Sequence, residues 1–318
     1  MAIKKKTYLI SGGAGFVGSH LAEELVKNGN KVIIIDDFSN GSIKNLSGFK
    51  NKVKVIRGDI SWNLNKLNNI FKPYKFDGIF HLACWPRSLS LEFPKRDLEV
   101  NALGTLNMLE VAKKHNCKLV FTSNSGIIGN PKYLPSDEKH PDQPSTPYDA
   151  NKLVGEYYCK IYNDIHSVKV GVVRFAAVYG DRQRTKPGWK PLIAEFVDKI
   201  SNNKSPIINW DGEQSRDFVY VKDAVQGVLK AFKGNTKGGE YYLISTNKET
   251  TVNLLFNTVN QLLGKDIKPI RRNKTPGDIR RMKLSYNKAK KTFDYQPKYS
   301  LKMGVQNYID WYFSEYKK

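Results

Sequence analysis

The sequence has few cysteines and no long apolar run. Its three cysteines, Cys84, Cys117 and Cys159, are widely separated and form no CxxC pair, which argues against a disulfide framework and a zinc site. Apolar runs such as Val32–Ile35 are far shorter than the roughly 20 residues that cross a bilayer. The apolar stretch after the basic start of the chain is broken by Ser11 and Gly12 within a few residues, unlike the apolar core of a secretory signal. We therefore expect a protein of the reducing cytosol with no membrane partner.

Acidic residues are also scarce relative to basic ones. The chain carries 52 Lys and Arg against 30 Asp and Glu, a formal net charge of +22, which is typical of proteins that bind nucleic acid or membrane surfaces. The basic residues are scattered, and even the densest stretch, Gly264–Lys291, shows no zinc-finger, basic-zipper or RNA-binding pattern. We therefore expect no nucleic-acid partner, and an anionic small substrate accounts for part of the excess. The histidines have no partner spacing, so no metal site is expected.

The order of the expected elements indicates an α/β fold. A length of 318 residues favours about two domains. Up to residue 179, short apolar runs alternate with stretches of helical period, which predicts a Rossmann-type doubly wound parallel sheet. The expected strands are Tyr8–Ile10, Val32–Ile35, Val53–Ile56, Gly78–Leu82, Leu119–Phe121 and Lys169–Arg174, and the expected helices are Val17–Lys27, Asp97–Lys114 and Tyr148–His166.

Beyond residue 179 the pattern changes, because Pro, Gly and Asn become frequent and short helices mix with short strands. The expected helices of this part are Leu192–Ile200, Asp223–Phe232 and Leu301–Phe313. We predict one domain over residues 1–179 and a smaller C-terminal α/β domain over 180–318, some segments of which return to the first.

A glycine-rich turn lies between the first expected strand and the first expected helix. It places glycines at 12, 15 and 18. They allow a tight turn, close approach of the backbone to a diphosphate, and close packing of helix and sheet, while the helix N-terminus offers N–H groups to the phosphates. The next strand ends in Asp36–Asp37, where a carboxylate accepts hydrogen bonds from ribose hydroxyls and repels a 2′-phosphate. These residues predict a site for NAD in the first domain, which leaves the second domain for the substrate.

A second candidate site lies at the start of the long helix. Tyr148 and Lys152 are four positions apart and therefore share one helix face. Because an ammonium favours the phenolate, we expect Lys152 to lower the tyrosine pKa from about 10 toward the working pH. Such a pair also occurs by chance on solvated helix faces, but its position downstream of a dinucleotide turn favours a reaction centre.

Several further motifs follow in order along the chain. With them the chain resembles the extended short-chain dehydrogenase/reductase family over nearly its whole length, specifically the NAD-dependent sugar-nucleotide epimerases and dehydratases. The motifs that carry the resemblance are Gly12–Gly18, Asp36–Gly41, Gly58–Ile60, His81–Ala83, Tyr148–Lys152, Arg174–Phe175, Val178–Gln183 and Asp211–Val221.

The resemblance implies roles for individual residues. Tyr148 would be the acid/base, and Lys152 would tune it and hold the nicotinamide ribose. Arg216 would reach the diphosphate of a nucleotide sugar, because a guanidinium is planar and permanently charged. Arg182 and Arg280 are further candidates for substrate binding. The cofactor-binding residues would be Gly12, Gly15, Phe16, Val17, Gly18, Asp36, Asp37, Asp59, Ile60, Leu82, Ala83 and Lys152.

Two positions depart from the family pattern. Relatives carry Ser or Thr after the fifth strand, where this chain has Asn124, whose amide donates a hydrogen bond but does not relay a proton as a hydroxyl does. A shift of one residue would instead bring Ser125 or Ser123 into place. Ala177 stands where relatives often have an Asn that contacts the substrate. The acidic pair that 4,6-dehydratases place in the same loop is also missing, which favours an epimerase.

The resemblance therefore implies an NAD-dependent sugar-nucleotide epimerase, similar to UDP-hexose 4-epimerases, that acts through a transient keto-sugar. A dehydratase, decarboxylase or reductase of the same family is an alternative, and so is a non-catalytic NAD-binding regulator. Relatives commonly pair through two helices, so we expect a cytoplasmic homodimer that uses Asp97–Lys114 and Tyr148–His166.

Overall fold

The computed structural model describes residues 5–185, 191–274 and 279–316. Part of the basic start of the chain and residues 275–278 of the basic stretch lie outside these ranges.

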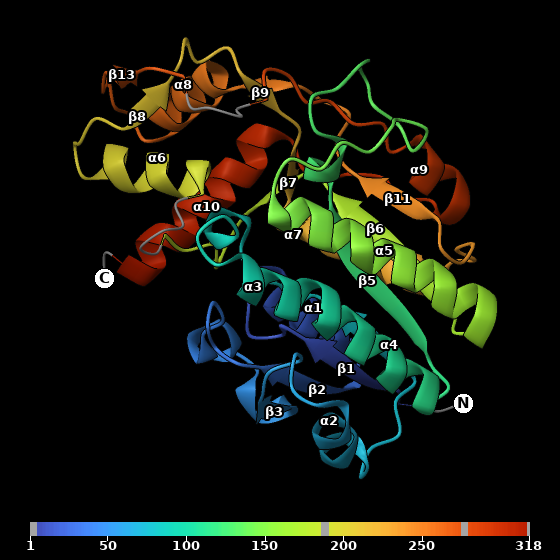
Figure 1. Cartoon of the computed structure of the whole chain (residues 1–318). Helices are drawn as coiled ribbons and strands as arrows, with labels where there is room; N and C mark the ends of the chain where they lie inside the picture. Colours follow the sequence, from blue (N-terminus) through green and yellow to red (C-terminus); the bar gives the residue numbers. More distant parts are fainter. Residues whose placement is uncertain (1–4, 186–190, 275–278, 317–318) are drawn as a thin grey trace.

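A seven-stranded parallel sheet forms the centre of the molecule, in the order β11-β6-β5-β4-β1-β2-β3 (Figure 1). The chain builds β2 and β3 on one side of β1 and β4 to β6 on the other, and doubly wound sheets bind ligands at the carboxyl ends of the strands where this reversal occurs. The expected Rossmann-type fold is confirmed. The strands are β1 (Thr7–Ser11), β2 (Lys31–Asp36), β3 (Val53–Arg57), β4 (Gly78–His81), β5 (Lys118–Asn124), β6 (Val170–Phe175) and β11 (Tyr241–Ile244).

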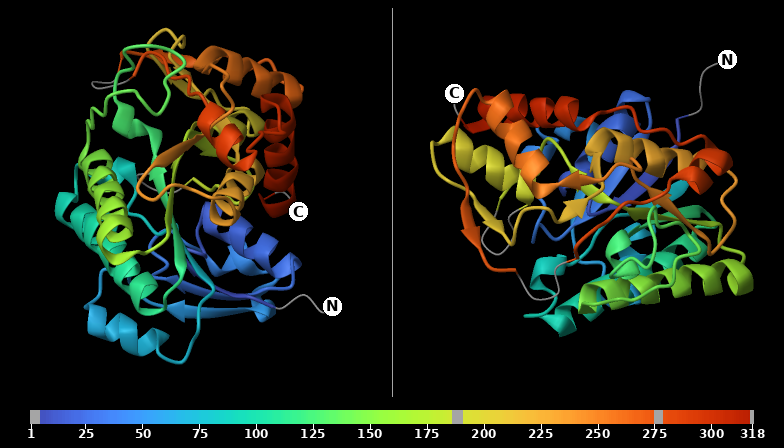
Figure 2. Two further views of the ribbon diagram at one scale, coloured as in Figure 1. Left: turned by 90° about the vertical axis from the view of Figure 1, so that its right-hand side faces the viewer. Right: turned by 90° about the horizontal axis from the view of Figure 1, so that it is seen from above.

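Helices cover both faces of this sheet (Figure 2). Successive strand residues point to opposite faces. Leu9 of β1 packs in the core with α2, α4 and α5, whereas its neighbours Tyr8 and Ile10 pack in the core with α1 and α7. Because both faces are covered, the central strands are apolar throughout. The helices are α1 (Phe16–Lys27), α2 (Leu64–Phe71), α4 (Gly104–Lys114), α5 (Pro147–His166) and α7 (Val221–Lys233).

The stretch predicted as one helix over Asp97–Lys114 is interrupted. The short helix α3 (Pro94–Asp97) continues through a π-helical turn, η4 (Leu98–Leu103), into α4. Within the turn, the side-chain oxygen of Asn101 accepts a hydrogen bond from the Trp85 backbone N–H at 3.1 Å. A local widening of this kind redirects side chains, and here it links the helix to the loop that follows β4.

Most of the remaining elements lie at the carboxyl edge of the sheet or beyond it, whereas α9 packs against α7 and β11. Three small sheets pair β7 with β10, β9 with β12 and β8 with β13. Since β11, α7 and α9 pack with the first part of the chain, segments beyond residue 180 contribute to the central layers, and the boundary at 179/180 stays a prediction. These elements are β7 (Ala177–Tyr179), α6 (Leu192–Ser201), β8 (Ile207–Asn209), β9 (Ser215–Arg216), β10 (Phe218–Tyr220), β12 (Thr250–Thr251), α8 (Val252–Leu262), β13 (Ile270–Arg272), α9 (Asn287–Phe293) and α10 (Leu301–Tyr316).

Short 3-10 turns complete the description: η1 (Ile43–Leu46), η2 (Lys50–Lys52), η3 (Arg87–Leu89) and η5 (Ser125–Ile128). Within the described ranges, no helix combines the length and the apolar character that crossing a membrane requires.

Candidate functional site

The glycine turn connects β1 to α1 at the carboxyl edge of the sheet. Gly12 has a φ of +72°, a left-handed conformation that favours glycine, and a side chain on it would bring its Cβ to 2.6 Å from the Ala83 nitrogen. A Cβ on Gly18 would collide with the carbonyl oxygen of Gly12. The turn is therefore closely packed and lies at the N-terminus of α1. Both features are typical of turns that bind a diphosphate.

The carboxylate of Asp36 is held beside this turn. One oxygen accepts a hydrogen bond from the Ala14 N–H at 2.9 Å and the other accepts one from the Phe38 N–H at 2.9 Å. Asp36 is buried at the end of β2, so its position is set by the backbone around it. A side chain at Gly41 would strike this carboxylate, which explains the glycine at that position.

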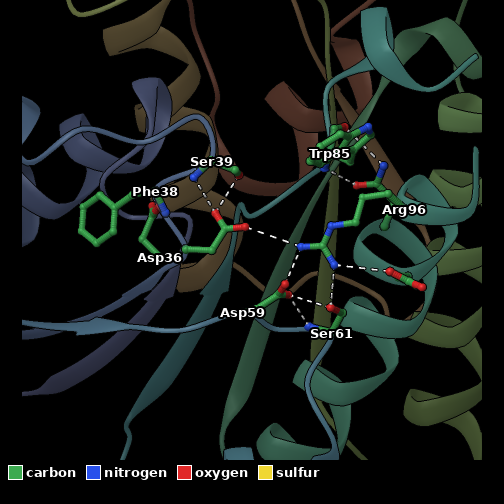
Figure 3. A network of polar contacts seen from close by, with 10 residues as sticks. Asp36, Phe38, Ser39, Asp59, Ser61, Trp85 and Arg96 are labelled. Carbon is green, nitrogen blue, oxygen red and sulfur yellow. Dashed lines mark hydrogen bonds and ion pairs between the residues drawn. The ribbon is translucent and has the colours of Figure 1, made fainter. Parts of the chain in front are cut away.

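A network around Arg96 lies at the ends of β2 and β3 (Figure 3). Arg96 reaches from α3, forms an ion pair with Asp59, and lies 3.6 Å from the carboxylate of Asp37. It also donates a hydrogen bond to the Ser61 hydroxyl at 3.0 Å and lies 5.7 Å from the centre of the Trp85 ring. Burial opposes ionisation of Asp59, but hydrogen bonds from Ser61 and Arg96 outweigh it and lower the pKa of this carboxyl.

A cavity of about 650 Å³ runs from the glycine turn past Asp36 and Asp59 to Tyr148. It contains most of the residues that the sequence assigned to the cofactor. Three predicted site residues do not line this cavity: Lys152, which is only 2% exposed, Asn124 and Ser125. The predicted residues that line the cavity are Gly12, Gly15, Phe16, Val17, Gly18, Asp36, Asp37, Asp59, Ile60, Leu82, Ala83 and Tyr148.

Tyr148 and Lys152 lie in the first turns of α5, which begins at Pro147 after the N-cap Thr146. The ammonium of Lys152 donates a hydrogen bond to the Thr122 carbonyl at 2.7 Å, and burial lowers its pKa. The sequence predicted that the pKa of Tyr148 is lowered, and this prediction is wrong when only the groups of the protein are considered. Burial raises the pKa of Tyr148 well above its usual value, and the neighbouring groups Cys84 and Asp149 add to the increase.

The loop after β5 contains the predicted hydrogen-bonding residues. The side-chain oxygen of Asn124 accepts a hydrogen bond from the Gly126 N–H at 2.6 Å and caps η5. Its side-chain nitrogen is buried and has no hydrogen-bond partner among the described residues, which leaves a donor available. A Cβ on Gly126 would lie 2.5 Å from the Asn124 oxygen and 2.6 Å from an oxygen of Asp149, so this loop reaches the start of α5. Ser125 is buried, and the buried hydroxyl of Ser123 has no described partner.

A second cavity, of about 600 Å³, lies between α6 and the small sheets of the C-terminal part. Arg216 lines it and donates hydrogen bonds to the carbonyls of Ser215 and Ile279, both at 2.8 Å. Arg272 of β13 also lines it. The sequence did not single out Arg272, because it lies in a basic stretch that resembles a solvated surface.

The two other predicted arginines point elsewhere. Arg182 forms an ion pair with Glu23 of α1 and donates a hydrogen bond to Ser19. Arg280 forms an ion pair with Asp211 at 2.7 Å and lies 4.4 Å from the Trp210 ring. Neither lines either cavity, and substrate binding by these two residues stays a prediction. The described residues contain no cluster of three or more metal-binding side chains.

Comparison with known proteins establishes the family. Residues 9–308 match the family model described as GDP-mannose 4,6 dehydratase. The chain belongs to the extended short-chain dehydrogenase/reductase family of sugar-nucleotide epimerases and dehydratases. The family expected from the sequence is thus confirmed, and so is the expected class of NAD-dependent enzyme.

Three members of this extended family are especially similar. A putative UDP-glucose 4-epimerase of Methanocaldococcus jannaschii is 38% identical over 95% of this chain and 97% of its own length. The structure of UDP-glucose 4-epimerase from Thermotoga maritima with UDP-glucose has a TM-score of 0.91 at 32% identity, covering 97% of this chain and 99% of that one. The Thermus thermophilus UDP-glucose 4-epimerase complex with NAD has a TM-score of 0.85 at 28% identity, covering 96% and 98%. Decarboxylases and dehydratases also occur among the matches.

Proposed function

We propose that this protein is an NAD-dependent 4-epimerase of a nucleotide sugar, and that its substrate is a UDP-hexose. One observation carries the proposal: the glycine turn, Asp36 and Tyr148 line one continuous cavity, so a dinucleotide bound to the turn would bring its reactive ring to the phenol. The 4-epimerases among the similar proteins support the choice of reaction.

The residues present fit NAD. Gly12, Gly15 and Gly18 line the cavity without side chains, which allows close approach of a diphosphate to the backbone, and Asp36 provides a fixed acceptor for ribose hydroxyls. Asp59 and Ile60 would contact the adenine, and Leu82 and Ala83 would line the dinucleotide. When bound, NAD supplies the acceptor and donor of the hydride.

The chain's own groups would handle the proton and the sugar. Tyr148 takes the proton of a sugar hydroxyl as the hydride leaves its carbon, and returns it after the keto-sugar has turned over. Because the protein groups raise the pKa of Tyr148, a nearby positive charge must stabilise its phenolate, and Lys152 is the cation fixed on the same helix face. The amide of Asn124 would donate a hydrogen bond to the reacting oxygen.

The substrate's diphosphate would bind in the second cavity. Arg216 lines that cavity with part of its guanidinium held by two carbonyls, which fixes its orientation, and Arg272 provides a second cation there. Arg280 and Arg182 would reach the substrate only after leaving the carboxylates that they now contact.

The decisive experiment is product analysis. The purified protein is incubated with UDP-glucose, UDP-galactose, UDP-N-acetylglucosamine, UDP-glucuronate and GDP-mannose, and the products are identified by NMR. An epimer without CO₂, water loss or accumulated NADH supports the proposal, and a Tyr148→Phe variant should lose nearly all turnover. A pentose product identifies a decarboxylase and a 4-keto-6-deoxy product a dehydratase. Bound NAD without turnover of any sugar identifies a non-catalytic protein.

We further propose a cytosolic homodimer. The three cysteines are unpaired, as in a reducing compartment. Helices α4 and α5 lie side by side (Figure 1), and η4, which precedes α4, and α5 expose an apolar surface. Such a surface is typical of a protein–protein contact. Its residues are Leu98, Leu103, Val154, Tyr157, Ile161 and Ile165.

A further inference from the structure

A charge pair lies directly beside Tyr148. Two guanidinium nitrogens of Arg87, in η3, donate hydrogen bonds to the carboxylate of Asp149. Nε lies 3.2 and 3.3 Å from the two oxygens, and Nη2 lies 3.1 Å from one of them. Asp149 follows Tyr148 in the first turn of α5. The pair therefore joins the loop after β4 to the helix that presents the phenol.

The two partners differ in exposure. The side chain of Asp149 is 0% exposed, whereas that of Arg87 is 46% exposed and lines the cofactor cavity. Asp149 also accepts hydrogen bonds from the hydroxyls of Thr146 at 2.7 Å and Ser145 at 3.4 Å. These hydroxyls are neutral, so Arg87 is the cation that compensates this buried carboxylate. An uncompensated buried charge acts strongly on its neighbours.

We propose that Arg87 is a positioning residue that acts through Asp149: by neutralising this carboxylate it allows Tyr148 to give up and recover its proton. This inference rests on the proposed role of Tyr148 as the acid/base. An acidic residue in the first turn also stabilises a helix N-terminus, which is a purely structural role. The two roles differ in what they do to the proton affinity of the phenol.

Titratable groups of three elements act on the phenol. Cys84 acts on it from the loop after β4, Asp97 from α3 and Asp149 from α5, where Lys152 shares the helix face of Tyr148. Burial raises the pKa of Tyr148, and Cys84, Asp149 and Asp97 raise it further. Without Arg87, the full charge of Asp149 would act on the phenolate and disfavour it more.

The test is a spectroscopic titration of Tyr148. Phenolate absorbance is followed against pH in the full-length protein, with and without NAD, and the curve of the matching Tyr148→Phe background is subtracted. Arg87→Gln should raise the midpoint by about one pH unit, at the lower end of the effect of a nearby charge. The double variant Arg87→Gln with Asp149→Asn should return it to the wild-type value or below, and Arg87→Lys, which keeps the charge, should stay near wild type.

The control is Arg184→Gln, which removes an arginine bound to Glu315 outside both cavities and should leave the midpoint unchanged. An unmoved midpoint in Arg87→Gln, a double variant that stays raised, or Arg87→Lys behaving like Arg87→Gln would each overturn the inference. If the protein turns over a sugar, kcat of Arg87→Gln is measured at a pH below the midpoint. It should fall about tenfold for each pH unit by which the midpoint rises, and KM for the sugar should change little. The titration needs no substrate, so it remains informative if no sugar is converted.

Discussion

The two polar atoms of the Asn124 side chain differ in their hydrogen bonding. Its oxygen caps η5, while its nitrogen is buried without a partner at the loop that reaches the start of α5. The oxygen is therefore structural, and the nitrogen is free to donate to a substrate oxygen. A serine at this position would retain a capping oxygen and add a hydroxyl that relays a proton.

Two substitutions separate these functions. Asn124→Ser should keep the melting temperature near wild type and keep or raise kcat of epimerisation. Asn124→Ala should lower the free energy of unfolding by about 1 kcal/mol through the lost cap and reduce kcat by about tenfold through the lost donor. Denaturant unfolding and steady-state kinetics measure the two effects. An alanine variant with unchanged kcat would contradict the assigned hydrogen bond.

Arg96 fixes the carboxylate that would meet the adenine. In Arg96→Gln, Asp59 loses its ion pair, so the affinity for NAD should fall by about tenfold, and the preference for NAD over its deaminated analogue, which lacks the adenine amino group, should decrease. Calorimetry with both dinucleotides measures this. Arg57→Gln is the matched control, because Arg57 is an exposed arginine at the end of β3 that lies near the Phe38 ring. Equal losses in both variants would indicate a general charge effect.

Sequence reasoning was effective for residues whose role depends on local backbone. The glycine turn and Asp36 are read from spacing within one βαβ unit, and the structure brings them into one cavity. Arg96 and Arg87 were not assigned to their carboxylates, because Arg96 and Asp59 are 37 residues apart and Arg87 and Asp149 are 62 apart, so only the folded chain brings them together.

At the scale of elements, the carboxylate of Asp217, between β9 and β10, connects this segment to two other parts of the chain by hydrogen bonds. Asp217 is 1% exposed and accepts hydrogen bonds from the Thr246 N–H at 2.8 Å and the Thr246 hydroxyl at 2.7 Å. It also accepts one from the Leu284 N–H at 3.2 Å. Burial dominates over these hydrogen bonds and raises its pKa to about 6.

A raised pKa gives a definite pH dependence. The folded state holds the proton more tightly than the unfolded state, so the contribution of Asp217 to stability is complete below its ordinary pKa of 3.8 and is lost as the pH rises through about 6. The difference in free energy of unfolding between wild type and Asp217→Asn should therefore decrease by roughly 2–3 kcal/mol between pH 4 and 7. Denaturant melts at several pH values measure it. A difference that stays constant would contradict the raised pKa.

Most expected helices and strands of the first half were found, since their apolar periods are long and regular. The π-helical turn at Leu98–Leu103 was not predicted, because it preserves the apolar period closely enough to look like one helix. Arg174, part of a motif shared with the family, is buried between Glu156 and Asp142, with its nitrogens 2.7 and 2.6 Å from their oxygens. It thus anchors α5 to β6, a structural role that its place in a motif did not reveal.

At the scale of the whole molecule, the apolar surface of η4 and α5 predicts a dimer. Tyr157 and Ile165 are 60% and 71% exposed on α5. Tyr157→Glu with Ile165→Glu should shift the protein to monomers in sedimentation velocity, because two charges would be buried at the contact. Leu254→Glu, which alters an exposed leucine of α8, should leave the association state unchanged. A monomeric wild type would remove the basis of this prediction.

The parallel pairing of β11 with β6 has a consequence for how the chain becomes stable. Residues Tyr241–Ile244 complete a layer whose other strands all precede residue 176. A fragment cut at residue 179 would present the bare hydrogen-bonding groups of β6 to other chains and would tend to aggregate. The parts of the chain that form the first and the second cavity are therefore expected to unfold in a single cooperative step, and neither part should be obtainable alone as a well-behaved protein.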